Sequence, residues 1–143
     1  MKFWDSSAVV PLLVPEVMSG SVQRLYEDDP VMAAWWATEI ECTSAIARRQ
    51  RLGRLSENVA AEGFVRLKAL REGWHEVEPG EELRESAERL LRVHDLRTAD
   101  ALQLAAAVYV AEARPSTLEF VSLDDRLLAA ARREGFPTTK PTP

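Results

Sequence analysis

The segment from Thr98 to Ala113 constrains the fold of this 143-residue chain more than any other. It is the most apolar part of the sequence, is rich in alanine and has almost no polar face. A helix of this kind is stable only where other elements cover it on most sides. We therefore expect a buried central helix here. Asp100 interrupts the apolar run and calls for a separate explanation.

Short apolar runs alternate with helical patterns along the rest of the chain. Strands are expected at residues 2–4, 31–37, 74–77 and 118–123, and helices at 6–13, 38–52, 56–73, 81–93, 98–113 and 124–133. This alternation predicts an α/β fold with a central, mostly parallel sheet flanked by helices, because right-handed crossovers are the usual connection between such strands. We expect one domain at residues 1–136 and an extended C-terminal tail at 137–143.

Composition limits the classes of function. The formal net charge of −5 argues against a passive nucleic-acid coat, which needs a basic face, although the basic residues within 48–54 and 66–71 allow a local basic rim. One cysteine, Cys42, excludes an internal disulfide, and two separated histidines have no zinc spacing. No apolar run is long enough for a signal core or a membrane span, so we expect a cytoplasmic protein with no membrane association.

Four carboxylates occupy the same kind of position. Asp5 ends the first expected strand, Glu41 and Asp100 fall in the first turns of helices, and Asp124 lies where the last expected strand meets a helix. In a parallel sheet all these positions lie on one edge, so the side chains can converge. Clustered carboxylates repel each other unless a cation lies among them. Oxygen ligands without histidine or cysteine favour Mg²⁺, with Mn²⁺ as a substitute.

Each acid also has a purely structural explanation. Thr38-x-x-Glu41 matches a capping box, Asp100 suits the dipole of its helix, and Asp124 can be an N-cap. Capping is the better explanation for Glu41 alone. A ligand role is the better one for Asp100, because burying an unpaired carboxylate costs several kcal/mol. Taken together, the four positions favour a shared site, since independent caps have no reason to fall on one edge.

Four fragments carry a resemblance to a known family. They are Asp5-Ser6-Ser7-Ala8 and the segments 41–48, 96–105 and 120–127. In this order and spacing the sequence resembles the PIN-domain proteins, and specifically the VapC toxins of toxin–antitoxin pairs, from residue 3 to residue 136.

The resemblance implies an activity and a site. The family is one of metal-dependent endoribonucleases, in which Mg²⁺-activated water hydrolyses RNA. On this basis Asp5, Glu41, Asp100 and Asp124 are the catalytic and metal-binding acids, and Ser7 is a polar neighbour of them. The resemblance also implies a homodimer and a cognate antitoxin that inserts a peptide near the acids.

Some positions leave alternatives open. Gln103 stands where many relatives have histidine. Glu39 competes with Glu41, and we choose Glu41 because the Ser-Ala-x-x-Arg that follows it has the family spacing. For Arg48 and Arg97, contact with phosphate and an ordinary surface role are equally good explanations.

Two other functions compete with the nuclease. A haloacid-dehalogenase-like phosphatase also begins with an Asp after an apolar strand, but its second Asp would stand where this chain has Ser7. A non-catalytic interaction protein of the same fold would expose Trp35, Trp36 or Trp74 to a partner, whereas we expect these tryptophans to pack in the core.

Overall fold

A five-stranded parallel sheet organises the chain in the computed structural model, which describes residues 1–143. Its order is β3-β2-β1-β4-β5, and each neighbouring pair is parallel. The strands are β1 (Lys2–Trp4), β2 (Met32–Trp35), β3 (His75–Val77), β4 (Glu119–Val121) and β5 (Thr138–Thr139). The predicted α/β class with a central parallel sheet is confirmed.

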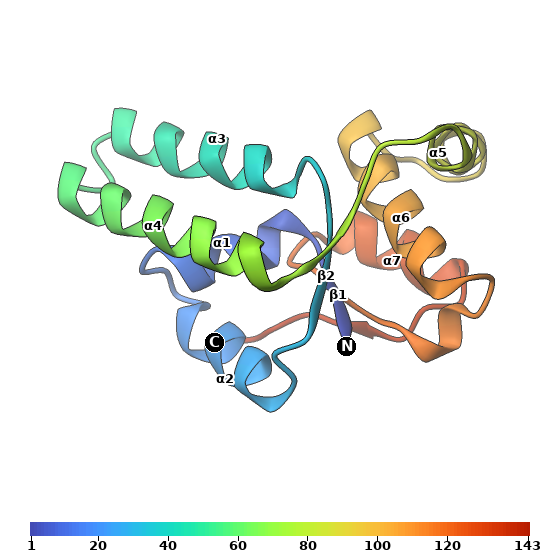
Figure 1. The fold of residues 1–143 in the computed structure, drawn as a ribbon, viewed down its shortest axis with the longest axis horizontal. Helices are drawn as coiled ribbons and strands as arrows, with labels where there is room; N and C mark the ends of the chain where they lie inside the picture. Colours follow the sequence, from blue (N-terminus) through green and yellow to red (C-terminus); the bar gives the residue numbers. More distant parts are fainter.

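Seven α-helices cover the two faces of this sheet (Figure 1). One face is covered by α1 (Ser6–Leu13), α2 (Ser19–Asp28), α3 (Thr38–Arg51) and α4 (Glu57–Gly73). The other is covered by α5 (Glu81–Val93), α6 (Thr98–Ala111) and α7 (Asp125–Arg133), with a short 3₁₀ turn at Pro115–Thr117 before β4. None of the helices combines the length and the apolar character that crossing a bilayer requires.

Side chains alternate between the two faces along each strand. Phe3 packs with α5–α7 and Trp4 with α1–α4, and both are fully buried. Phe3 stacks on Phe120 of the neighbouring strand with ring centroids 5.4 Å apart, while Val121 joins the core on the other side. Because successive strand residues point to opposite faces, these short strands contribute to both halves of the core.

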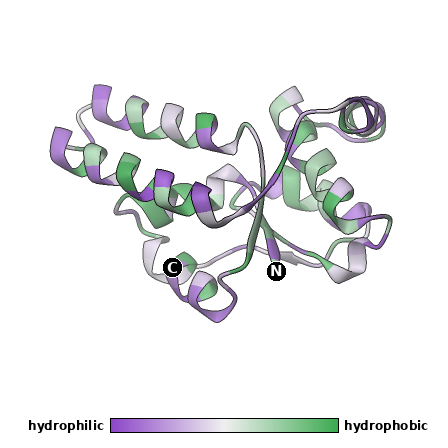
Figure 2. Ribbon diagram, viewed as in Figure 1, coloured by the Kyte–Doolittle hydropathy of each residue, from purple (hydrophilic) through white to green (hydrophobic).

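Helix α6 is the central helix expected from its composition. Its side chains at Ala101 and from Leu104 to Ala107 are fully buried between α5, α7 and the sheet. Figure 2 shows it as mostly hydrophobic. The helix ends at Ala111, two residues before the expected end, because Glu112 and Ala113 adopt left-handed backbone conformations. Tyr109 is 53% exposed, so one stripe of the helix does face solvent.

The α4 helix crosses close to α1 at a glycine. A Cβ at Gly63 would lie 2.8 Å from Val14 Cγ1 and 3.3 Å from Ile46 Cδ1. Only a residue without a side chain lets the helices approach this closely. The start of α4 follows the sequence prediction, because Ser56 is the N-cap and its hydroxyl accepts a hydrogen bond from Val59 N.

The C-terminal segment takes part in the sheet. Thr138 and Thr139 of β5 pair with Phe120 and Val121, and Phe120 N donates to Pro137 O over 2.8 Å. The chain from 137 to 139, expected as part of an extended tail, therefore forms the edge of the sheet. A strand of two residues leaves no periodicity to detect in a sequence.

Two of the three tryptophans considered as partner contacts, among the four in the chain, pack in the core as expected. Trp35 and Trp74 are 5% and 7% exposed, whereas Trp36 is 42% exposed. The prediction that all three lie in the core is therefore wrong for Trp36. It is the first residue after β2, where the chain leaves the sheet.

Candidate functional site

The four predicted acids all lie at the edge where the parallel strands end. Asp5 directly follows β1, and its backbone N–H donates to Val121 O of β4 over 3.0 Å. Glu41 is in the first turn of α3, which follows β2, and Asp100 is in the first turn of α6. Asp124 follows the end of β4 and begins α7. The fold thus brings residues from four separate parts of the chain to one place.

Asp5 is the most buried of the four acids, with 4% of its surface exposed. Its Oδ2 accepts hydrogen bonds from Ser7 Oγ at 2.5 Å and from Ser122 Oγ at 2.8 Å. Burial raises the pKa of Asp5, the two serine hydroxyls counteract this, and the charge of Asp124 raises it further. The carboxylate is held in one orientation but is costly to ionise.

Ser122 belongs to this site although we did not predict it. It is fully buried and also accepts a hydrogen bond from Asp124 N over 3.0 Å. Ser7 makes the complementary link, because its Oγ accepts from Leu123 N over 2.9 Å. Both serines therefore join the end of β1 to the turn that carries Asp124. The available signal was a small polar residue within the apolar run expected as a strand.

Glu41 lies among the other acids and is held by a side chain from α6. Gln103 Nε2 donates to Glu41 Oε1 over 2.6 Å and to Thr38 Oγ1 over 3.0 Å. Burial raises the pKa of Glu41 to about 7, Gln103 opposes the shift, and the charges of Asp5 and Asp100 add to it. The capping-box explanation is wrong here, because α3 begins after Ala37 without any side-chain cap.

Glu39, the competitor of Glu41, has a different environment. Its carboxylate forms ion pairs with Lys68 and Arg71 of α4, the second at 3.1 Å. It therefore ties two helices together. Glu41 has no such partner on α4 and is the one that the charges of Asp5 and Asp100 affect.

Asp100 is half-buried near the start of α6, which has no side-chain cap. Burial raises its pKa, and the charges of Asp124 and Asp5 raise it further. Arg97 and Arg126 act in the opposite direction, so these are the arginines whose charge reaches Asp100. They supply positive charge beside the site.

Asp124 caps its helix and also lies within reach of two of the other acids. It is the N-cap of α7, and its Oδ1 accepts a hydrogen bond from Leu127 N over 3.0 Å. Its charge also acts on Asp5 and Asp100. The adjacent Asp125 differs, since its side chain is 82% exposed and pairs with Lys140 at 2.8 Å.

The basic residues of α3 and α4 are partly used in internal contacts. Arg49 pairs with Glu16 at 2.5 Å, and Arg66 donates to the backbone oxygen of Leu13 over 3.0 Å. Arg48, in contrast, is exposed on the last turn of α3. Arg49 and Arg66 are therefore not free to contribute to the basic rim that the sequence allows.

The acids interact through their charges but do not form a closed cage. No group of three or more histidine, cysteine, aspartate or glutamate side chains is close enough together to hold a metal ion as the side chains stand. The donors at this edge are all oxygens, which suit Mg²⁺ or Mn²⁺ and not zinc. The nearby Cys42 is buried and its thiol pKa is raised by burial, so it is a packing residue.

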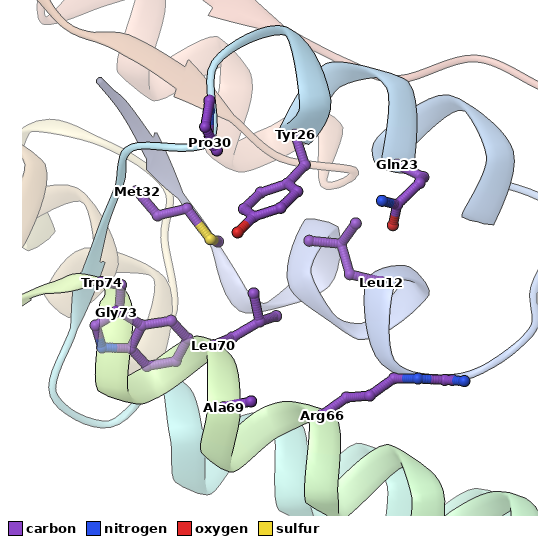
Figure 3. Close-up of a pocket in the computed structure, with 10 residues that line it drawn as sticks. All are labelled: Leu12, Gln23, Tyr26, Pro30, Met32, Arg66, Ala69, Leu70, Gly73 and Trp74. Carbon is purple, nitrogen blue, oxygen red and sulfur yellow. The ribbon is translucent and has the colours of Figure 1, made fainter.

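A separate cavity of about 320 Å³ lies near the N-terminal ends of the strands, opposite the end that carries the acids (Figure 3). It is bounded by α1, α2 and α4 near the start of β2, and Leu12, Tyr26 and Leu70 point into it. Its lining contains one charged side chain, Arg66, and no carboxylate. The cavity is therefore not part of the acidic site.

Comparisons with known proteins agree with this architecture. The model of the family described as "PIN domain" matches residues 2–133. Among solved structures, PAE2754 from Pyrobaculum aerophilum is 25% identical, with coverage of 96% of this chain and 87% of that chain and a TM-score of 0.65. VapC20 of Mycobacterium tuberculosis, described as a sarcin–ricin loop cleaving toxin, is 21% identical, with coverage of 99% and 100% and a TM-score of 0.70.

A third structure, a toxin–antitoxin complex from Klebsiella pneumoniae, is 15% identical, with coverage of 99% and 98% and a TM-score of 0.68. No curated protein matches the sequence. The family match spans nearly the whole chain and includes four of the five strands and all seven α-helices. The chain belongs to the PIN-domain family.

Proposed function

We propose that this protein is a Mg²⁺-dependent endoribonuclease of the VapC type, the cytoplasmic toxin of a toxin–antitoxin pair. One observation carries the proposal: acids from four separate segments meet at one sheet edge, where the charges of Asp5, Asp100 and Asp124 raise the pKa values of their neighbours. Carboxylates with raised pKa values cluster at functional sites, and a bound cation would relieve their repulsion. PIN domains are typically ribonucleases, which agrees with this chemistry.

The donor set fits a hard divalent cation, and Asp5, Glu41, Asp100 and Asp124 are the residues that would hold it. A bound Mg²⁺ would neutralise the acids, lower the pKa of a water molecule and stabilise the leaving oxygen of a phosphodiester. Ser7 and Ser122 orient Asp5 through their hydroxyls. Arg97 and Arg126 place positive charge beside Asp100, where the RNA phosphate would approach.

The direct test is cleavage of RNA by the purified chain with Mg²⁺ or Mn²⁺ and with chelator. Asp125→Asn is the matched control, because Asp125 is adjacent to Asp124 but faces solvent. Cation-dependent internal cuts by the parent and by this control, absent in Asp100→Asn, would support the proposal. Cleavage that is unchanged in chelator would refute it. Sequencing RNA ends from cells after induction of the chain would then identify the target.

The partner proposal is a small antitoxin that places a basic side chain at the acid edge, and a homodimer of the toxin. One of the similar structures is titled as a toxin–antitoxin complex and another as a toxin. The partly exposed acids Glu41, Asp100 and Asp124 are complementary to a lysine or arginine. Co-purification of the product of a neighbouring gene, with loss of cleavage in the complex, is the expected result. A toxin that stays monomeric at high concentration and binds no such product would contradict it.

A non-catalytic interaction protein is the second candidate, and the exposed Trp36 favours it. This indole lines a groove of about 520 Å³ with Trp35, Leu91 and Leu102, between the end of β2 and helices α5 and α6. Exposed apolar grooves of this kind serve protein contacts. The cleavage assay separates the two candidates, because a pure binder would not cut RNA with either cation.

A further inference from the structure

Gln103 is the one fully buried residue of α6 whose side chain is polar. Its carboxamide spans the gap between α6 and α3 and uses both of its N–H groups: one for Thr38 Oγ1 at 3.0 Å and one for Glu41 Oε1 at 2.6 Å. Its own Oε1 is buried and has no hydrogen-bond partner. A buried carbonyl without a partner is rare in proteins and calls for an explanation.

The orientation of the amide follows from its neighbours. Exchanging the nitrogen and oxygen of Gln103 would place a carbonyl oxygen 2.6 Å from Glu41 Oε1, so that two acceptors would face each other. The carboxylate therefore dictates which end of the amide faces it. In return the amide fixes one oxygen of Glu41, and the cost is the unpaired carbonyl.

We propose that Gln103 is a positioning residue for cation binding: by donating to Glu41 Oε1 it holds the Glu41 carboxylate towards Asp5 and Asp100. The inference rests on the proposed metal-dependent function. Gln103 suits this task because α6 is enclosed by the core and also carries Asp100, three residues earlier on the same helix. One rigid element thus supplies one acid and orients another. Residues that orient metal ligands typically change metal affinity by about 10- to 100-fold when they are removed.

A purely structural role for Gln103 makes a different prediction. In that case its bond to Thr38 would serve only to join α3 and α6, and its loss would lower stability without changing cation affinity. Thr38→Val is the matched control, because it removes the other partner of the same amide and leaves the contact with Glu41 in place. Gln103→Met keeps the length and volume of the side chain but has no N–H to donate.

The experiment measures Mn²⁺ binding by calorimetry and thermal stability in chelator. We expect Gln103→Met to weaken Mn²⁺ binding by about 10- to 100-fold. Thr38→Val should change the Kd for Mn²⁺ by less than about threefold, because it leaves the binding site intact. In a Glu41→Gln background, Gln103→Met should have no further effect, because its influence passes through that carboxylate. A Gln103→Met protein that binds Mn²⁺ like the parent, or an effect that adds fully to that of Glu41→Gln, would overturn the role of Gln103.

Two further outcomes keep the test decisive. A parent that binds neither Mn²⁺ nor Mg²⁺ would overturn the proposed function itself, which distinguishes that failure from failure of the Gln103 role. If Gln103→Met does not fold, nuclear magnetic resonance of the parent replaces it. The side-chain amide protons of Gln103 should shift on saturation with Mg²⁺, as the carboxylate that they contact binds the cation, and resonances that do not move would overturn the inference.

Discussion

Replacing Glu41 by glutamine tests whether the acid edge is destabilised until a cation binds. Glutamine keeps the shape of the side chain and an oxygen that can accept from Gln103, but it removes the charge. The fold raises the pKa of Glu41 from 4.5 to about 7. This rise corresponds to a free-energy cost of about 3 kcal/mol for ionising Glu41 in the folded protein. Solvent screening at the exposed side of the carboxylate reduces this cost to roughly 1–2 kcal/mol.

The sign of the pH dependence follows from the direction of this shift. The folded state binds the Glu41 proton more tightly than the unfolded state. The contribution of this protonation to the stability of the fold is therefore complete below pH 4.5 and is lost as the pH rises through about 7. The metal-free parent should therefore lose roughly 1–2 kcal/mol relative to Glu41→Gln across this range. Asp5 and Asp100, whose pKa values are also raised, titrate in both proteins and largely cancel in the comparison.

Thermal melts followed by circular dichroism measure both effects. In chelator at pH 8 we expect Glu41→Gln to melt about 3–6 °C above the parent, and at pH 4 the two should melt together. A hundredfold excess of Mn²⁺ over its Kd should stabilise the parent by roughly 2.7 kcal/mol, and the variant should lose most of this gain. Glu39→Gln is the control, since Glu39 pairs with Lys68 and Arg71 and should gain nothing at pH 8. A Glu41→Gln protein that is less stable than the parent at pH 8 in chelator would refute the reasoning.

Three further substitutions test the rest of the site. Asp100→Asn should abolish cation-dependent RNA cleavage, while its melting temperature in chelator stays at or above that of the parent, because the variant removes repulsion with Asp5 and Asp124; parental cleavage activity would exclude a ligand role. Asp124→Asn should impair cleavage far more than Asp125→Asn in parallel assays, since only Asp124 acts on the other acids, and the reverse order would reject the assignment. Ser122→Ala should lower the free energy of unfolding by about 1–3 kcal/mol in urea titrations, because Asp5 loses a buried donor; an unchanged midpoint would show that this hydrogen bond adds no stability.

Local patterns were sufficient to predict most of the fold. The bounds of α5 agree with the prediction at both ends, and those of α1, α3 and α4 agree to within one residue, because apolar periodicity, the Ser56 cap and the left-handed Gly53 depend on neighbours in sequence. The placement of Asp5, Glu41 and Asp124 at one edge also followed from sequence, since it needs only the junction of each strand with its helix and the parallel direction of the sheet. Asp100 differs, because it lies in the first turn of α6, which follows α5 and not a strand. Strand β5 and the exposure of Trp36 did not follow, because both depend on which segment covers an edge.

By itself the sequence determined the α/β class, the buried α6 and the four acids at strand ends and in the first turns of helices, because each of these is set by residues within a few positions of one another. Only the tertiary structure decided how the acids are held. Ser122 reaches Asp5 across 117 positions and Gln103 reaches Glu41 across 62, and no sequence pattern links the two partners of either contact. Hydrogen bonds of this range exist only after the helices have packed on the sheet, since packing sets the distance and the burial that fix the direction of each side chain.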